Sequence, residues 1–574
     1  MKKKAFTLIE LLAVIIILAV IALIATPIVL DVINDARKSA YNSSARMIIA
    51  GANNYYAESM LDSTKTGIDG KTNVFDKVVQ NMQGEMPESG EIYINKQGLV
   101  AVALVYNKTC YIKDFKSSDL LETENIEQCK VTYTDSILNG ADPELDSAMI
   151  PVVIDGNGNL TKADTRAEWY NYEKKQWANV VLVSDATRDE YKNAEAGYPI
   201  KTKDVTAYYV WIPRYNYVIF TDVENLETVG SISDSSSYTN RASIINVEFE
   251  DNTADKQTGV NKGDKLTHPA FTFGNEELNG IWVGKFETTG TENAPTVLAY
   301  DSRYTETSGI QSLRGKNVST QFAISQKINY GLTDKEASML KNMEWGAVAY
   351  LTGSQYGQGT TEVMINNSSN YNTGCAASEY PTTTYGNYSG FAGCENEWYT
   401  SAGQKASTTG NVYGVYDMSG GAWEYVMGVM EDAKDSGVPA SGRNNTYNSG
   451  FTGTLTYPND GSAPSITSIN GVAFPDEKYF DVYPYDTSSI VYADRGQLGD
   501  ATFELDGFSN WVDPDGNRRY HTGWHQDYAY FVVDGNPWFR RGGYWSNGAS
   551  AGVFALHITN GAADSVLSFR SVLR

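Results

Sequence analysis

The first 31 residues decide how the chain is organised: Met1-Lys-Lys-Lys-Ala5, then Phe6-Thr-Leu-Ile-Glu10, then an uncharged, mostly apolar run from Leu11 to Leu30, closed by Asp31. As a helix, the run from 11 to 30 would be about 30 Å long, which is the thickness of the hydrocarbon core of a bilayer. Glu10 is the exception at its start. A carboxylate costs roughly 2.5–3.5 kcal/mol at mid-bilayer on insertion scales, so Glu10 is expected to have a function and a partner.

This order of residues resembles the class III leader and N-terminal helix of type IV pilins and pseudopilins. The resemblance implies that a prepilin peptidase in the membrane cleaves between Ala5 and Phe6 and methylates the new amino group of Phe6. It also implies that Glu10 pairs with that amino group of a neighbouring subunit, so the other partners are pilin subunits. Pro27 lies where the family often bends its helix. Ala5 departs from the usual glycine, but its side chain is also small.

Two other interpretations of this segment are a secretory signal peptide and a plain signal anchor. A signal peptide carries its charge only before the apolar core and has a small-x-small cleavage site after it. Here Glu10 lies at the start of the core, and no A-x-A triplet follows the core. The pilin-like interpretation is therefore favoured.

The composition indicates a protein whose bulk lies outside the cell. The chain has 574 residues, which is too long for one domain, and we find no second membrane-spanning run after residue 30. Lys2, Lys3 and Lys4 place the N-terminus in the cytoplasm by the positive-inside rule. We therefore expect a single-pass membrane protein before assembly and a cell-surface or pilus protein afterwards. The net charge of −24 disfavours nucleic acid as a partner.

Four cysteines permit three disulfide connectivities. Pairing Cys110 with Cys129 and Cys375 with Cys394 closes one short loop in each region, so we predict these two bonds. An exported chain permits disulfides. The rival is a metal site, but the sequence has no C-x-x-C pair and its four histidines are scattered, whereas structural zinc sites need closely spaced ligands.

We expect an α+β protein with four segments. Residues 1–5 form the leader, and residues 6–130 form a long helix to about Leu61 followed by a small antiparallel sheet. The second half of the helix is expected to pack on the sheet, because apolar residues recur there at steps of three and four: Tyr41, Ala45, Ile48, Ala52 and Tyr55. Residues 131–204 read as a connector or small β module, and residues 205–574 as one large unit.

Several strings in residues 205–574 resemble, in order, the sulfatase-modifying or formylglycine-generating enzyme domain, which has a C-type-lectin-like fold. The most specific string is Tyr416-Asp-Met-Ser-Gly420 followed by Trp423-Glu424. The others are Tyr208–Pro213, Ile281–Thr289, Glu344–Tyr350, Arg540–Trp545 and Ser568–Ser571. The resemblance implies a loop-rich, C-type-lectin-like domain.

We expect this domain not to be an enzyme. The oxidase members of the resembling family use a cysteine pair in their C-terminal part, and a redox nucleophile needs a thiolate. Here no cysteine follows Cys394. The iron-dependent relatives use a histidine cluster, which the four histidines of this chain do not suggest. We interpret His521 and His525 as surface histidines, for lack of a third ligand at metal spacing.

Two stretches of this unit point to binding. Residues 353–404 contain no Lys or Arg and read as a surface insertion held by Cys375 and Cys394. Residues 538–557 resemble the variable region of lectin-fold proteins that retroelements diversify. That resemblance implies a binding surface for an extracellular protein or glycan, formed by Tyr544, Ser546, Asn547, Ser550, His557 and Thr559. Such side chains give adaptable contacts at low entropic cost. The alternative is that Trp538, Trp545 and Phe554 are core and the small polar residues are plain loop.

No cofactor or metal is expected, although the family resemblance allows structural calcium. Asp155-Gly-Asn-Gly-Asn159 and Asp513-Pro-Asp-Gly-Asn517 have the composition of calcium loops. The first lacks the downstream glutamate of a full calcium loop. Plain turns are favoured at both, because Asn-Gly and Asp-Gly pairs are strong turn signals.

The sequence therefore predicts a pilin-like, membrane-anchored or filament subunit that displays a non-catalytic, lectin-like adhesin domain. The first alternative is a surface-tethered modifying enzyme of the formylglycine-generating kind. The second is a pseudopilin of a type II secretion or DNA-uptake machine. A C-terminal cysteine pair would favour the first, and the acidic charge disfavours direct DNA capture.

Overall fold

The structure is a computed structural model. It describes residues 8–60, 62, 65–68, 70, 72–80, 85–95, 98–115, 120–126, 129–131, 140–165, 168–219, 245–261, 263–304, 310–380, 390–430, 449–452, 454–456, 465–467, 472–473, 475–484, 496–504, 525, 527–533 and 535–574. The chain divides into two compact units. Unit 1 comprises residues 1–135 and 166–168, and unit 2 comprises residues 136–165 and 169–574.

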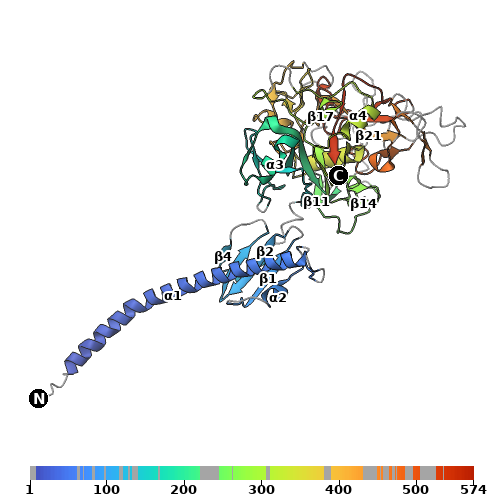
Figure 1. Ribbon diagram of the computed structural model, residues 1–574. Coiled ribbons are helices and arrows are strands. Elements are labelled where there is room, and N and C mark those ends of the chain that lie inside the picture. The colour runs from blue at the N-terminus through green and yellow to red at the C-terminus, as the bar shows by residue number, and fades with distance from the viewer. Residues whose placement is uncertain are drawn as a thin grey trace. The chain divides into compact units, whose positions relative to one another are not determined.

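Unit 1 is a single long helix with a small sheet. Helix α1 (Leu8–Ser59) is followed by the short α2 (Phe75–Val79) and by four antiparallel strands in the order β1-β2-β3-β4. The strands are β1 (Ser89–Ile94), β2 (Val100–Tyr106), β3 (Thr109–Lys113) and β4 (Leu121–Thr123). The C-terminal half of α1 lies along this sheet (Figure 1). The predicted long helix and small antiparallel sheet are confirmed, and the helix ends two residues before the predicted Leu61.

The two halves of α1 have different surroundings. In the second half, four members of the predicted stripe, Tyr41, Ala45, Ile48 and Ala52, are buried against the apolar side chains of α2, β1 and β2, and the fifth, Tyr55, is half-buried. The large apolar side chains that are described between residues 8 and 29 are exposed, from 45% for Val14 to 87% for Leu8. Exposed apolar surface of this extent marks a face that another molecule or a membrane covers. Among the fully described residues, no helix carries an apolar stretch long enough to cross a membrane.

Unit 2 is built around two sheets. The larger has the strand order β18-β30-β15-β9-β7-β5-β6-β8, and all of its pairings are antiparallel. These strands are β5 (Ile150–Ile154), β6 (Leu160–Lys162), β7 (Asn179–Val183), β8 (Pro199–Ile200), β9 (Val205–Pro213), β15 (Gly280–Gly284), β18 (Ala337–Met339) and β30 (Ser571–Leu573). The C-terminal strand thus lies between two strands from far earlier in the chain.

The smaller sheet has the order β26-β21-β27-β28, with β29 also paired to β21. Its strands are β21 (Trp423–Met430), β26 (Asp481–Tyr483), β27 (Trp538–Arg541), β28 (Leu556–Thr559) and β29 (Leu567–Phe569). Three helices accompany the sheets: α3 (Asp185–Asn193), α4 (Val318–Ser325) and α5 (Asn342–Thr352). Indole rings fill much of the core, including those of Trp211, Trp282 and Trp345.

Short strands, arranged in one three-stranded and five two-stranded sheets, complete the described part of unit 2. These are β10 (Tyr215–Val218), β11 (Asn246–Phe249), β12 (Leu266–Thr267), β13 (Thr272–Phe273), β14 (Glu276–Glu277), β16 (Thr289–Thr291), β17 (Ala294–Thr296), β19 (Cys375–Ala376), β20 (Asn396–Glu397), β22 (Phe451–Thr452), β23 (Thr454–Thr456), β24 (Ser465–Thr467) and β25 (Val472–Ala473). The chain is mixed helix and sheet, as predicted.

The structure corrects the predicted boundary at residue 204. Strands β5 to β8 lie within the segment assigned to a connector or small β module, residues 131–204, yet they form one half of the large sheet. Strand β7 pairs with β9 over Asn179–Val183, so the sheet runs without interruption across residues 204 and 205. The segment from residue 140 onward is therefore part of the same core as residues 205–574.

A buried carboxyl group joins two elements of unit 2. Glu504 Oε2 accepts hydrogen bonds from the hydroxyl groups of Tyr217 in β10 (2.7 Å) and Tyr350 in α5 (2.8 Å). The backbone N–H of Gly499 also donates to it, over 2.7 Å. Burial raises the pKa of Glu504 from 4.5 to about 7. Between these two values the folded state retains a proton that the unfolded chain has released, so stability is lost as the pH rises through this window.

We expect the free energy of unfolding of unit 2 to fall by about 2 kcal/mol between pH 5 and pH 7 on account of Glu504. In the Glu504→Gln variant, which resembles the protonated acid at every pH, this part of the fall should be absent. Urea titrations at both pH values measure it. The exposed Glu276 provides the control, Glu276→Gln, which should keep the wild-type dependence. An equal fall in Glu504→Gln and the wild type would contradict the assignment.

Candidate ligand-binding site

One face of the smaller sheet gathers an arginine, a histidine and several aromatic rings. In the strand register, Tyr425 of β21 lies opposite Arg540 of β27, and Arg540 lies opposite His557 of β28. Directly opposed residues point to the same side of a sheet and contact each other. The three side chains therefore form a row across three strands.

Arg540 is half-buried and has no carboxylate partner among the described residues. Its guanidinium carbon lies 4.8 Å from the centre of the Trp423 ring, and its Nη2 lies 3.0 Å from Nδ1 of His557. No described acceptor bonds to its Nε. Burial lowers the pKa of Arg540, while the nearby tyrosines and Asp564 act in the opposite direction. An arginine held among rings without a carboxylate is an uncompensated positive charge.

His557 lies among aromatic rings. Its ring is nearly parallel to those of Tyr528 and Tyr530, with centroids 4.9 and 5.5 Å away. Burial, with a contribution from Arg540, lowers the pKa of His557 to about 3, so the imidazole is neutral at physiological pH. Its Nδ1 also lies 2.9 Å from the carbonyl oxygen of Ile558. A neutral Nδ1 either donates to Ile558 or accepts from Arg540, and in both tautomers Arg540 lacks an anionic partner.

The predicted binding residues divide between two environments. Tyr544, Asn547, His557 and Thr559 are half-buried, and His557 and Thr559 lie on this face, whereas Ser546 (8% exposed) and Ser550 (5% exposed) are buried. The side-chain oxygen of Asn547 accepts from the backbone N–H of Tyr544 over 2.8 Å and so shapes the loop after β27. The Thr559 hydroxyl lies 3.0 Å from that of Tyr425. Trp538 and Phe554 are core residues, as the alternative interpretation stated for them.

Sequence reasoning missed Arg540, Trp423, Tyr528 and Tyr530. Arg540 and Trp423 both lie in strings quoted for the family resemblance, but nothing in those strings distinguishes Arg540 from its neighbour Arg541. Arg541 is fully buried and donates from Nε to the side chain of Asn342 over 2.8 Å. Alternation along a strand is the one available signal, since it sends Arg540 and Arg541 to opposite faces.

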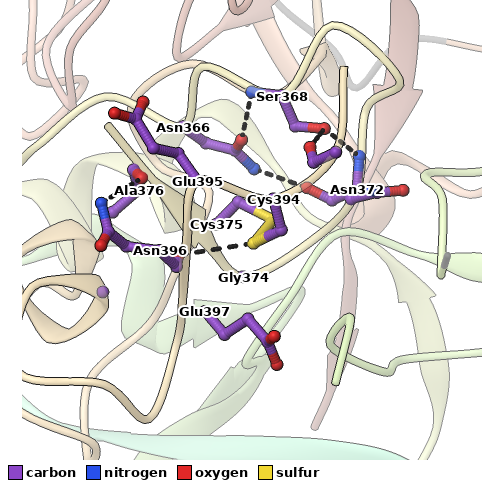
Figure 2. The surroundings of a disulfide bond; sticks show 12 residues. Asn366, Ser368, Asn372, Gly374, Cys375, Ala376, Cys394, Glu395, Asn396 and Glu397 are labelled. Atoms are coloured by element: carbon purple, nitrogen blue, oxygen red, sulfur yellow. Dashed lines mark hydrogen bonds between the residues drawn. A yellow bond between two sulfur atoms is a disulfide. The ribbon is translucent and has the colours of Figure 1, made fainter. Parts of the chain in front are cut away.

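Both predicted disulfides are present, Cys110–Cys129 in unit 1 and Cys375–Cys394 in unit 2. Figure 2 shows the second bond among buried polar side chains. The side-chain amide of Asn366 accepts from the backbone N–H of Ser368 over 3.0 Å and donates to the carbonyl of Asn372 over 2.8 Å. The hydroxyl of Ser368 donates to the carbonyl of Gly393 over 2.7 Å. The first two bonds shape the segment before Cys375, and the bond from Ser368 to Gly393 ties that segment to the one before Cys394.

The prediction that residues 353–404 form a surface insertion is wrong for residues 363–368 and 372–377, which are buried. Asn366, Ser368, Thr373 and Cys375 are fully buried, because their polar groups bond to one another and to neighbouring loops. A Cβ atom built on Gly390 would come within 2.5 Å of the Trp545 ring, so this segment lies against the loop after β27. The two stretches that the sequence singled out for binding are thus neighbours.

The other candidate sites have plain structural explanations. Asp155 accepts the backbone N–H groups of Asn157 and Asn159, each over 2.9 Å, so its carboxylate is used within the β5–β6 turn. His525 is half-buried and borders a small cavity with Glu362 and Asp527, which corrects its assignment to the open surface. His521 and the stretch 513–517 lie outside the described residues. Among the described residues, no three His, Cys, Asp or Glu side chains form a metal-binding group.

Comparison with known proteins identifies the start of the chain. Residues 1–26 match the prokaryotic N-terminal methylation motif, which is type IV pilin-like. The motif indicates a membrane-anchored subunit that is later exposed at the surface, processed by a prepilin peptidase and assembled with pilin subunits. Ala5 and Phe6 lie outside the described residues, and the side chain of Glu10 is not described.

Two solved structures are similar to the chain. Treponema denticola variable protein 1 shows 12% identity and a TM-score of 0.22 over 56% of this chain and 92% of its own. The Major Tropism Determinant I1 variant shows 9% identity and a TM-score of 0.22 over 86% of this chain and 95% of its own. No curated protein matches. Scores this low support no argument about unit 2, so its C-type-lectin-like and formylglycine-generating assignments stay predictions.

Proposed function

We propose that the protein is a pilin-like filament subunit whose unit 2 is a non-catalytic, ligand-binding head displayed outside the cell. The observation that carries the proposal is the methylation motif on residues 1–26, continuous with one helix that reaches Ser59. The second half of that helix holds its own globular unit, while its first half leaves apolar side chains exposed. Burial of that surface, first in a membrane and then among other subunits, would drive assembly.

The ligand-binding part of the proposal is supported by the row formed by the buried Tyr425 and the half-buried Arg540 and His557. Binding sites combine aromatic side chains with a few fixed polar groups, and this face has both. All four cysteines of the chain are in disulfides, which supports a display role over thiol chemistry. The ligand classes that we propose are an extracellular protein or a glycan.

The N-terminal peptide tests the anchoring part. We expect mass spectrometry of protein from sheared surface filaments to find a peptide that begins at an N-methylated Phe6. A Glu10→Ala variant should remain with the membrane and be absent from the sheared fraction, because it lacks the carboxylate that is expected to pair with the amino group of a neighbouring subunit. Glu58 lies near the other end of the same helix and is paired with Lys65, so Glu58→Ala is the control that should still assemble.

An N-terminus at Met1, with the protein confined to the membrane fraction, would refute the filament proposal. The chain would then be a tethered receptor.

A further inference from the structure

We propose that the face around Arg540 binds a carboxylate-bearing saccharide, with the guanidinium of Arg540 as the anchor for the carboxylate. This inference rests on the proposed function of unit 2 as a ligand-binding head and adds the chemical class of the ligand. It starts from one anomaly. In a chain of net charge −24, a half-buried arginine has no ion-pair partner among the described residues.

Among the described residues of unit 2, the fully buried arginine and lysine head groups bond to protein acceptors, and the half-buried Arg314, whose Nε also lacks a partner, donates to the carbonyl oxygen of Ser565 and lies over the Tyr371 ring. Arg570 is bidentate to Glu424, Arg574 to Glu344, and Arg214 is paired with Glu250 and Glu277. Lys285 donates to the side-chain amide oxygen of Asn179 and to the backbone carbonyl oxygens of Val412 and Gly414. The guanidinium of Arg540, by contrast, contacts the imidazole of His557 through Nη2 and lies over the Trp423 ring, and it bonds to no carboxylate among the described residues. Carboxylates match the planar fork of a guanidinium, so the missing partner is an anion of that kind.

The surroundings of Arg540 favour a sugar as the body of the ligand. Tyr528 and Tyr530 are half-buried and their rings stack on that of His557, with centroids 4.9 and 5.5 Å away, and the half-buried Tyr544 is close enough to Arg540 to raise its pKa. Such amphipathic rings suit a ligand that has one apolar side and many hydroxyl groups. Thr559, also half-buried, adds a hydroxyl beside Tyr425. The imidazole of His557 is neutral, so it does not offer a second positive charge, and one carboxylate completes the site.

The test uses the full chain from sheared filaments and a panel of immobilised oligosaccharides. Each acidic member, terminated by a sialic or a hexuronic acid, is paired with its neutral parent. We expect binding to the acidic members, weakening as salt is added, and at least tenfold weaker binding by Arg540→Gln. The control is Arg303→Gln: Arg303 also lies over tyrosine rings but is paired with Asp301, and its loss should leave binding unchanged. Tryptophan fluorescence of each variant establishes that unit 2 is folded.

The possible outcomes separate this inference from the proposed function. Binding to neutral and acidic members alike, with no effect of Arg540→Gln, would refute the carboxylate inference and leave the ligand-binding head intact. Binding only to acidic peptides, dependent on Arg540, would refute the saccharide. Filaments that bind none of the oligosaccharides, acidic or neutral, and none of the peptides would refute both. A preference for sialic over hexuronic acid, or the reverse, would identify which acidic sugar the site accepts.

Discussion

The Arg570→Met variant should lose about 3–5 kcal/mol of the free energy of unfolding of unit 2. Arg570 and Glu424 are both fully buried, and Arg570 bonds through Nε (3.1 Å) and Nη2 to the two carboxylate oxygens. Its remaining donors reach the carbonyl oxygens of Gly284 (2.8 Å) and Tyr416 (2.9 Å). It therefore joins the larger sheet to the loop that precedes β21.

The expected loss of unfolding free energy is large because the positive charge of Arg570 stabilises more than one buried carboxylate. Glu287 and Asp417 are buried next to Glu424, and burial together with this mutual repulsion raises the pKa of Glu287, whereas Arg570 lowers it. Removing the cation leaves three buried carboxyl groups without it. Breaking a buried pair from one side costs much more than replacing both partners by apolar groups.

Tryptophan fluorescence during urea unfolding measures the change. All 11 tryptophans lie in residues 169–545, so the signal reports on unit 2 alone. The control is Lys265→Met, which breaks an ion pair of unit 2 whose two side chains are 42% (Lys265) and 68% (Glu248) exposed and which should cost no more than about 1 kcal/mol. The Glu424→Gln, Arg570→Met double variant should recover part of the loss. A loss below about 1 kcal/mol in the single variant would contradict the role assigned to Arg570.

Local patterns allowed much of unit 1 to be predicted from the sequence. The stripe of Tyr41, Ala45, Ile48 and Ala52 has helical spacing, and each of these side chains is buried as that spacing requires. The strands around Val100–Tyr106 follow from an apolar run bounded by turn residues, and the disulfides follow from cysteines close in sequence. These features depend on neighbours along the chain, which the sequence displays directly.

The site in unit 2 depends instead on contacts between distant segments. The neighbours of Arg540 on its two sides, Tyr425 and His557, come from strands that lie far from it in the chain, and a one-residue slip of either strand would turn those side chains away. The same reason explains the wrong boundary at residue 204. The pairing of β7 with β9 is a tertiary contact between two segments, and no local pattern in the sequence indicates which strands pair. The missing partner of Arg540 is a property of three-dimensional surroundings and has no sequence signal.

Replacing Cys375 and Cys394 together by alanine should destabilise unit 2 by about 3 kcal/mol and weaken ligand binding at the same time. The bond spans a sequence separation of 19, and a loop of this length gives about 3 kcal/mol in the chain-entropy account. The Cys375–Cys394 bond should also affect binding, because the segment that it closes lies beside the loop after β27. The segment that it closes pairs Ser369 with Phe391 over 2.9 Å, and Gly390 lies against the Trp545 ring, next to Tyr544.

The matched control is the Cys110→Ala, Cys129→Ala double variant, which removes a bond of the same separation, 19, from unit 1. Because the tryptophans report only on unit 2, this control should leave the fluorescence transition and the affinity for an acidic saccharide unchanged. A Cys375→Ala, Cys394→Ala variant that loses stability but keeps full affinity would show that the Trp545 loop holds its shape without the bond. Loss of both would establish that the disulfide segment supports one wall of the binding face, and that Arg540 depends on this wall for its access to ligand.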